Sequence, residues 1–243
     1  MATQRNDIHN SNVPILCRSC EARHKGMCGV LDTDQLVELA HHTRTVTHEA
    51  GEELIGDSTP IQSYANVMRG VVKLTKVLED GRQQVVGLQF APDFLGRLYG
   101  AENRVSAEAA TEVEVCRVPR HALESLIAGN PALEHRLMQQ TLRELDEARD
   151  WMVALGRKTA QEKVASFLYL IAGHIDPAFE ADASGPSAFD LPLSRADMAD
   201  YLGLTIETVS RQMTKLRAAG IIGIVNYRHI EVPDLDALKA RCG

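Results

Sequence analysis

Three of the five cysteines lie close together near the N-terminus, with a spacing that suits metal binding. Cys17, Cys20 and Cys28 form the pattern C-x2-C-x7-C. Two thiolates three positions apart can bind one metal centre, and a third can reach it after a short loop. An odd number of cysteines in a cytosolic chain also favours metal or redox chemistry over disulfides. We therefore expect a metal site here, with a fourth ligand that lies outside these three cysteines.

The fourth ligand decides which metal such a site takes. His24 lies within the loop and would complete a Cys3His zinc site. A distant cysteine, either Cys116 or Cys242, would instead give four thiolates, and cysteine-only ligation favours an iron–sulfur cluster. The spacing leaves both alternatives open.

The segment that carries Cys116 belongs to a region of short strands. Between Val46 and Val118, apolar runs are separated by glycines at intervals typical of an antiparallel sandwich or barrel. Asp80-Gly81 is the strongest hairpin signal in the chain. In Glu112–Val118 the valines alternate with other residues, so Cys116 faces outward if the valines form the core. An outward cysteine is unusual in a purely structural role and fits a ligand.

A second group of informative residues lies in the C-terminal part of the chain. Ser194 is a good helix N-cap, with Asp197 three positions later as the acidic partner of a capping box. After a turn at Gly203, Thr205 is a second N-cap, and Gly220 ends that helix. Two short helices joined by a glycine-containing turn predict a helix-turn-helix.

The second of these helices separates an apolar face from a polar one. Its apolar face carries Val209, Met213 and Leu216. The exposed candidates for contact with DNA are Glu207, Thr208, Ser210, Arg211 and Lys215. Arginine reads guanine and a carboxylate accepts from cytosine N4, so this face suits base edges and phosphates. Two predicted strands, at Ile221–Val225 and His229–Val232, follow as a small wing whose tip residues Arg228 and His229 could contact phosphate.

A long helix from Pro131 to about Lys158 separates the two regions. Its apolar stripe consists of Met138, Leu142, Leu145, Ala148, Met152 and Leu155. A narrow stripe sustained over several turns is typical of a coiled-coil seam, although packing on the protein's own sheet is the alternative. Asp150 lies near this seam and would meet its own twin in a parallel dimer, which weakens association.

Composition limits the remaining classes of function. The chain has 243 residues, 44% hydrophobic and 24% charged, with a net charge of −7, so a broadly basic nucleic-acid coat is excluded. DNA binding must come from a local patch, helped by dimerisation. No apolar run approaches the ~18 residues of a membrane span, and no signal peptide is recognisable, so we expect a cytoplasmic protein. No G-x-S-x-G, P-loop or H-E-x-x-H pattern supports an enzyme.

Together these features resemble the CRP/FNR transcription regulators over nearly the whole chain. The segment LTIETVSRQ resembles the family's recognition helix, with E-x-x-S-R at Glu207, Ser210 and Arg211, and RKTAQEKVASFL resembles the segment that precedes the DNA-binding domain. The resemblance implies an α+β fold with an N-terminal antiparallel, jelly-roll-like β-roll, a long dimerisation helix and a C-terminal winged helix-turn-helix. The implied domains are residues 1–30 for the cysteine segment, 31–130 for the sensor β-roll, 131–158 for the dimerisation helix and 159–243 for the DNA-binding domain.

The cysteines resemble those of the oxygen-sensing FNR branch, and the x7 spacing resembles its FnrL/FnrN group. That likeness implies a [4Fe-4S] cluster held by Cys17, Cys20, Cys28 and Cys116, in a homodimer that is active without oxygen. FixK-type members lack the complete cysteine set, so Cys116 is the discriminating residue. A cluster-free FixK-like regulator, or one stabilised by zinc through His24, is the alternative.

The resemblance also implies partners. E-x-x-S-R in FNR-type members reads the double-stranded palindrome TTGAT-N4-ATCAA, and the hairpin tip at Asp80-Gly81 is where such regulators touch the sigma factor of RNA polymerase, whose alpha subunit is a further expected partner. Cyclic AMP needs a Gly-Glu pair and an Arg-Ser pair. Here Arg97 follows Gly96, and Ala101-Glu102 takes the place of the second pair, so we expect no cyclic AMP binding.

Overall fold

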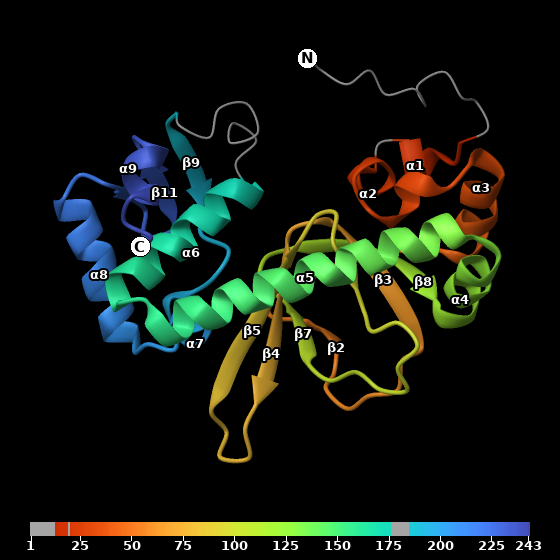
Figure 1. Cartoon of the computed structure of the whole chain (residues 1–243), viewed down its shortest axis with the longest axis horizontal. Coiled ribbons are helices and arrows are strands. Elements are labelled where there is room, and N and C mark those ends of the chain that lie inside the picture. Colours follow the sequence, from red (N-terminus) through yellow and green to blue (C-terminus); the bar gives the residue numbers. More distant parts are fainter. Residues whose placement is uncertain (1–12, 19, 176–184) are drawn as a thin grey trace. The chain divides into compact units, whose positions relative to one another are not determined.

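The computed structural model describes residues 13–18, 20–175 and 185–243 (Figure 1). The chain divides into two compact units, one formed by Met1–Lys76 with Gly87–Asp146 and the other by Val77–Val86 with Glu147–Gly243. None of the described helices is both long enough and apolar enough to cross a membrane.

The first unit begins with short helical segments. These are α1 (Ile15–Arg18), α2 (Glu21–His24), the 3-10 turn η2 (Met27–Val30) and α3 (Thr33–His42). Asp32 starts α3 with a capping box, because its side chain accepts from the Gln35 amide at 2.9 Å while the Gln35 side chain accepts from the Asp32 amide at 3.2 Å. The buried face of α3 carries Leu36 and Leu39.

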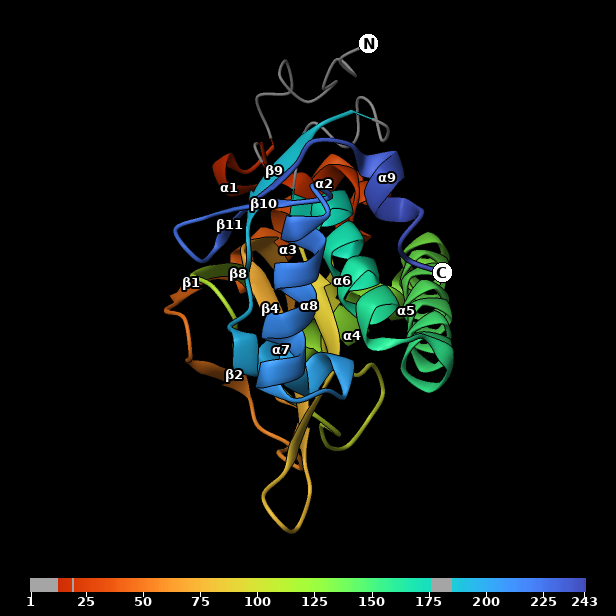
Figure 2. The same ribbon diagram turned by 90° about the vertical axis from the view of Figure 1, so that its left-hand side faces the viewer.

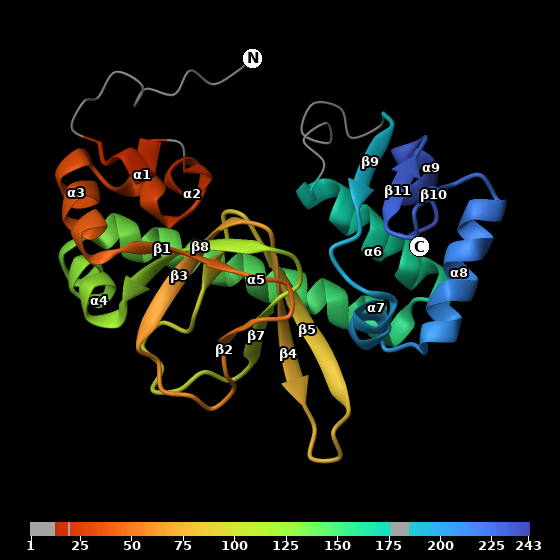
Figure 3. The same cartoon turned by 180° about the vertical axis from the view of Figure 1, so that it is seen from behind.

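Two antiparallel four-stranded sheets follow and form the predicted β-roll (Figure 3). Their strands are β1 (Arg44–His48), β2 (Glu53–Ile55), β3 (Ser63–Arg69), β4 (Val71–Val77), β5 (Gln83–Phe90), β6 (Phe94–Leu95), β7 (Ser106–Ala109) and β8 (Val113–Pro119). The orders are β1-β8-β3-β6 and β2-β7-β4-β5. Valines from both sheets, including Val67, Val72 and Val115, fill the space between them. The predicted hairpin at Asp80-Gly81 joins β4 to β5, and Gly81 has the positive φ of +86° that this turn requires.

A second core lies on the other face of the β1-β8-β3-β6 sheet. Tyr64 of β3 and Val118 of β8 pack there against Leu36 of α3, Leu123 of α4 (Arg120–Gly129) and Leu133 of α5 (Pro131–Arg157). Because side chains alternate along a strand, β8 serves both cores, with Val113 and Val115 in the roll and Val118 outside it. The helices therefore cover the sheet on the side where Cys116 also lies.

The helix α5 carries two apolar stripes. Leu133 and Leu137 are buried against the roll, whereas most of the predicted seam is exposed. The exposed members are Met138, Leu142, Leu145, Ala148, Asp150 and Met152, with Met152 70% exposed. The alternative prediction, that the stripe packs on the protein's own sheet, is therefore wrong for these residues. Leu155 departs from the prediction because it is half-buried and lies against Gly203, and Val153 is an exposed apolar residue that the seam prediction missed.

The second unit holds the C-terminal elements (Figure 2). These are α6 (Ala160–Ile175), β9 (Ser187–Asp190), α7 (Arg195–Leu202), α8 (Ile206–Ala218), β10 (Gly223–Val225), β11 (His229–Val232) and α9 (Leu235–Lys239). The three strands form an antiparallel sheet in the order β10-β11-β9, which is the predicted wing with one additional strand. The last part of α5 contacts α7 through Trp151 and Tyr201, whose rings stack with centroids 4.3 Å apart.

Candidate functional site

Four cysteines from two distant segments line one narrow cavity. Cys17 lies on α1, Cys20 follows it, Cys28 lies in η2 and Cys116 comes from β8. Cys116 faces away from the roll interior, as the alternation in its strand predicted. Cys242 belongs to the other unit, where its Sγ donates to the Leu238 carbonyl oxygen at 3.5 Å.

The wall of the cysteine cavity is mainly apolar, with Asn66 as its most deeply buried polar residue. Leu36, Leu39 and Met68 contribute apolar side chains. Asn66 on β3 pairs in register with Cys116 on β8, and its Nδ2 donates to Cys28 Sγ at 4.0 Å. The Asn66 side chain is 1% exposed and its Oδ1 has no hydrogen-bond partner among the described residues. This amide therefore stands between cysteines of the two segments.

Burial and mutual proximity both disfavour ionisation of the thiols. The pKa of Cys116 is raised to about 11, mainly by burial; Cys20 and Cys17 also raise this pKa, while a hydrogen bond with Thr43 lowers it. Burial also raises the pKa of Cys28, with Cys116 as the next cause. Thiolates in such a cavity need compensating positive charge, which a bound metal centre supplies when it displaces the thiol protons. The donor set therefore suits a thiolate-bound metal group.

The placement of His24 does not support the zinc alternative. His24 is exposed at the end of α2 and does not line the cavity that the cysteines share. Within the described ranges, no three His, Cys, Asp or Glu side chains are grouped as a single metal ion requires.

The helix-turn-helix begins and ends at the predicted residues. Ser194 accepts from the Asp197 amide at 3.1 Å, and the Asp197 carboxylate accepts from the Ser194 amide at 3.2 Å. Thr205 caps α8 by accepting from the Thr208 amide at 3.2 Å. Gly203 has a φ of +61°, which closes α7 in the left-handed conformation that glycine tolerates. Local capping thus fixes both helices and the turn between them.

The polar face of α8 is presented to solvent. Glu207, Ser210, Arg211 and Lys215 are exposed, while Thr208 is half-buried and accepts from Arg211 Nη2 at 3.5 Å. Backbone hydrogen bonding at the helix start, with help from Thr205, lowers the pKa of Glu207. Its carboxylate therefore stays ionised and able to accept from a base.

Thr214 is exposed on the same face, one turn beyond Ser210, and the sequence analysis missed it. Its position four residues after Ser210 and seven after Glu207 was the available signal.

The tip of the wing carries an exposed tyrosine beside the two predicted phosphate contacts. Tyr227 is 89% exposed with a φ of +63°, and its carbonyl oxygen accepts from Arg195 Nη2 at 3.4 Å. Arg228 is exposed at the tip as predicted. His229 is half-buried, and its Nδ1 lies 2.8 Å from Asp190 Oδ1 on the paired strand, so only its other ring nitrogen is left for the predicted phosphate contact.

Comparison with known proteins identifies a domain in each part of the chain. Residues 162–241 match the Crp-like helix-turn-helix domain and residues 45–130 match the cyclic nucleotide-binding domain. A probable transcriptional activator of Rhizobium leguminosarum bv. viciae is 53% identical over 98% of each chain. The chain belongs to the CRP/FNR family of transcription regulators. The transcriptional activator FnrL of Cereibacter sphaeroides is 39% identical over 93% of this chain and 92% of its own. The structure of FixK2 from Bradyrhizobium japonicum aligns with a TM-score of 0.76 at 33% identity, over 83% of this chain and 98% of that chain.

The β-roll of this CRP/FNR regulator contains another cavity, which is lined in part by Gly96 and Arg97. Its other charged lining residues are Arg104 and Glu144. Glu102, which takes the place of a cyclic AMP-binding residue in the sequence, does not itself line this cavity, whereas the neighbouring Asn103 does.

The predicted polymerase-contact turn of this regulator is exposed. Asp80 Oδ2 lies 2.8 Å from Arg82 Nε, so its charge is shared within the turn. The neighbouring Val77, Leu78 and Val86 are exposed apolar residues. An exposed turn flanked by apolar side chains can take part in a protein contact.

Proposed function

We propose that this CRP/FNR regulator is an oxygen-responsive transcriptional activator that works as a homodimer and carries a [4Fe-4S] cluster. Cys17, Cys20, Cys28 and Cys116 would hold the cluster. The observation that carries this proposal is that all four thiols line one cavity although Cys116 lies on a separate strand. Relatives named FnrL and FixK both resemble the chain, so overall similarity does not separate them and the cysteine set must.

When bound, the cluster would supply oxygen-labile links to four thiolates. The chain's own residues determine what those links hold together. Cys116 is fixed in the middle of β8, with β1 and β3 on either side. The other three cysteines belong to the short helical segment before α3, so the links would tie this segment to the roll.

The cysteine segment also contacts the long helix. Met27, next to Cys28, is fully buried in the same core as Leu133 and Leu137 of α5. Arg136, on the same helix, donates to the carbonyl oxygens of Lys25 and Gly26. Loss of the thiolate links would loosen these contacts and change the support under the first part of α5. Since α5 carries the exposed seam, dimerisation would then respond to oxygen.

Dimerisation would give the DNA affinity that one chain lacks. Two α8 helices about 34 Å apart can enter successive major grooves of a palindrome such as TTGAT-N4-ATCAA. Arg211 would donate to guanine and Glu207 would accept from cytosine, with about 1–3 kcal/mol of discrimination each. The turn at Asp80-Gly81 would contact the sigma factor, and the alpha subunit of RNA polymerase is the other expected contact.

The decisive experiment is anaerobic purification followed by visible absorption and iron and sulfide analysis, before and after air. We expect broad visible absorption with about four irons per chain, bleached by air. Cys116→Ser should abolish this signal, whereas Cys242→Ser, a matched control in the other unit, should retain it. Colourless protein with zinc or no metal would instead establish a zinc-stabilised or FixK-like regulator and end the oxygen-sensing proposal.

A further inference from the structure

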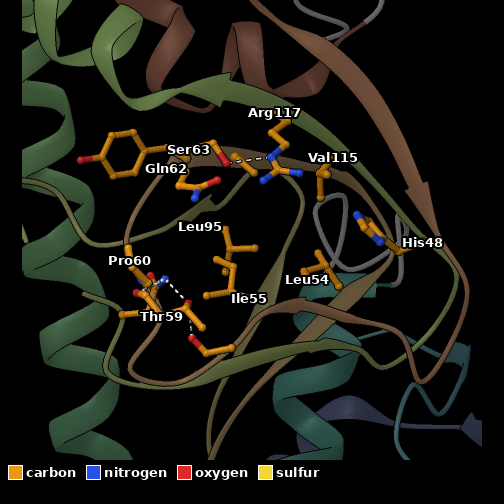
Figure 4. Close-up of a pocket in the computed structure, with 14 residues that line it drawn as sticks. His48, Leu54, Ile55, Thr59, Pro60, Gln62, Ser63, Leu95, Val115 and Arg117 are labelled. Carbon is orange, nitrogen blue, oxygen red and sulfur yellow. Dashed lines mark hydrogen bonds between the residues drawn. The ribbon is translucent and has the colours of Figure 1, made fainter. Parts of the chain in front are cut away.

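A separate cavity of about 260 Å³ opens into the β-roll (Figure 4). Its lining includes Arg117 and Val115 of β8, Ser63 of β3 and Ile55 of β2. It lies on the opposite face of β8 from the cysteine cavity, because Arg117 shares the inward face of Val115 while Cys116 points outward. The two cavities are therefore distinct.

Arg117 enters this cavity with little compensation for its charge. It is half-buried, and its Nε donates to Ser63 Oγ at 2.7 Å. Among the described residues, its Nη groups have no hydrogen-bond or ion-pair partner, and none of the residues lining the cavity is Asp or Glu. A guanidinium keeps its charge at any ordinary pH, and a half-buried charge is costly unless it is paired.

A second arginine lies opposite Arg117 on the neighbouring strand, with an exposed side chain that does not line the cavity. Arg44 on β1 lies directly opposite Arg117 on β8, and residues in register point to the same face of a sheet. Like charges directly opposite each other destabilise a sheet. An anion beside Arg117 would offset both this repulsion and the unpaired guanidinium.

The rest of the lining indicates the kind of anion. Gln62 is exposed and its side-chain amide has no hydrogen-bond partner among the described residues, so it can serve as a second donor. Asn103 and Thr59 are hydrogen-bonded to each other at 3.1 Å and are less available. Leu54, Ile55 and Leu95 give an apolar wall between these polar groups (Figure 4). A small ligand with one negatively charged group and a short apolar body would match this arrangement.

We propose that this cavity binds a small organic carboxylate. The carboxylate accepts from the Nη groups of Arg117, and the short apolar body contacts Ile55 and Leu95. A guanidinium pairs with a carboxylate through two parallel hydrogen bonds, and the apolar wall favours a carboxylate that carries a hydrocarbon body over inorganic phosphate. The cavity at Arg97 differs because the acidic Glu144 lines it together with Arg97 and Arg104, so its positive charges already face a carboxylate.

The test is isothermal titration of the full-length protein, prepared anaerobically in low-chloride buffer. Butyrate is the probe, butyramide is its neutral counterpart of the same shape, and inorganic phosphate is a second anion. Butyrate should bind at least tenfold more tightly than butyramide, and phosphate should bind more weakly than butyrate. This comparison uses the unaltered chain, so it does not depend on the folding of a variant. Equal binding of butyrate and butyramide, binding of phosphate alone, or no binding of butyrate would overturn the proposal.

Two substitutions locate the binding site. Arg117→Gln should weaken butyrate binding at least tenfold, and Gln62→Ala should weaken it a few-fold. Arg97→Gln, in the other cavity of the roll, should leave it unchanged. If Arg97→Gln rather than Gln62→Ala and Arg117→Gln reduced binding, the ligand would belong to the other cavity and the assignment would be wrong.

Discussion

The guanidinium of Arg136 on α5 donates from Nε to the carbonyl oxygen of Gly26, 3.3 Å away and two residues before Cys28. Its Nη2 donates to the carbonyl oxygen of Lys25 as well. One side chain of the long helix thus holds the main chain of the cysteine segment. Hydrogen bonds from a charged donor contribute about 1.5–3 kcal/mol, so this contact can bias a dimer equilibrium.

Replacing Arg136 by Gln should separate cluster binding from dimerisation. The four cysteines remain, so iron content should not change, while the anaerobic dimer dissociation constant should rise about tenfold, equivalent to ~1.4 kcal/mol. Sedimentation velocity with parallel iron analysis measures both quantities. Arg143→Gln, an exposed arginine on the same helix, is the matched control. An unchanged dissociation constant for Arg136→Gln would show that the contact does not transmit the signal.

If the exposed apolar stripe of α5 is the dimer interface, a charged residue placed in it should leave the protein monomeric. Leu145→Glu should prevent dimerisation even in anaerobic protein, because burying an unpaired carboxylate costs several kcal/mol. DNA affinity should fall with it, while the visible spectrum of the bound cluster should persist. Size-exclusion chromatography under anaerobic conditions provides the measurement, and a stable dimer of this variant would place the interface elsewhere.

Asp150 gives the opposite prediction. The side chain is exposed near the stripe, and removing its charge in Asp150→Ala should remove the repulsion between twin carboxylates in a parallel dimer. We expect a larger dimer population in air for this variant than for the unaltered protein, which the proposed function makes monomeric there. A variant that stays monomeric after exposure to air would count against Asp150 as a seam residue.

Two substitutions on α8 should separate base reading from phosphate contact. Arg211→Ala should cost about 1–3 kcal/mol on the intended palindrome and relax specificity at one base pair. Lys215→Ala should weaken all sequences about equally and lower the slope of log affinity against log salt by ~0.9. Titrations of intact and single-base-changed palindromes at several salt concentrations distinguish the two. Equal weakening of every sequence by Arg211→Ala would contradict its role as a base reader.

The hydrogen bond from Tyr64 Oη to Glu124 Oε1, at 2.7 Å, should make stability depend on pH. Tyr64 is the main cause of the lowered pKa of Glu124, so this stabilisation is present above the unfolded pKa, ~4.3, and is lost as pH falls through the lower folded pKa. Burial raises the pKa of Tyr64 to about 12, so folded protein also loses stability above the unfolded pKa of ~10. Tyr64→Phe should therefore cost about 1 kcal/mol near pH 7 and less at either extreme. Urea unfolding across pH measures this, and a cost independent of pH would contradict the assignment.

Features set by neighbouring residues could be predicted from the sequence. The caps at Ser194 and Thr205 need only residues within one helical turn, and the outward direction of Cys116 needs only the valines beside it. The position of Asn66 between Cys116 and Cys28 could not be predicted, because it depends on the register of β3 against β8 and on how the segment with Cys28 packs against β3. The partner of His229 could not be predicted either, since Asp190 comes from a strand outside the predicted hairpin.

Arg117 and Arg136 differ in how far the sequence alone indicates their roles. The alternation that turns Cys116 outward also turns Arg117 into the roll, and an inward arginine in a strand is as unusual as an outward cysteine. Arg136, by contrast, looks like any polar residue on the helix surface. Only the fold, which brings Gly26 beside it, shows its role.

The stacking of Trp151 on Tyr201 places an intrinsic fluorophore at one defined position in the protein. Trp151 is the single tryptophan of the chain, and its Nε1 also donates to the Tyr201 carbonyl oxygen at 3.3 Å. Intrinsic tryptophan emission therefore reports one junction, that between the end of the long helix and the first helix of the DNA-binding motif. Any rearrangement of that junction can be followed in solution by the colour and lifetime of this emission, without attaching a dye.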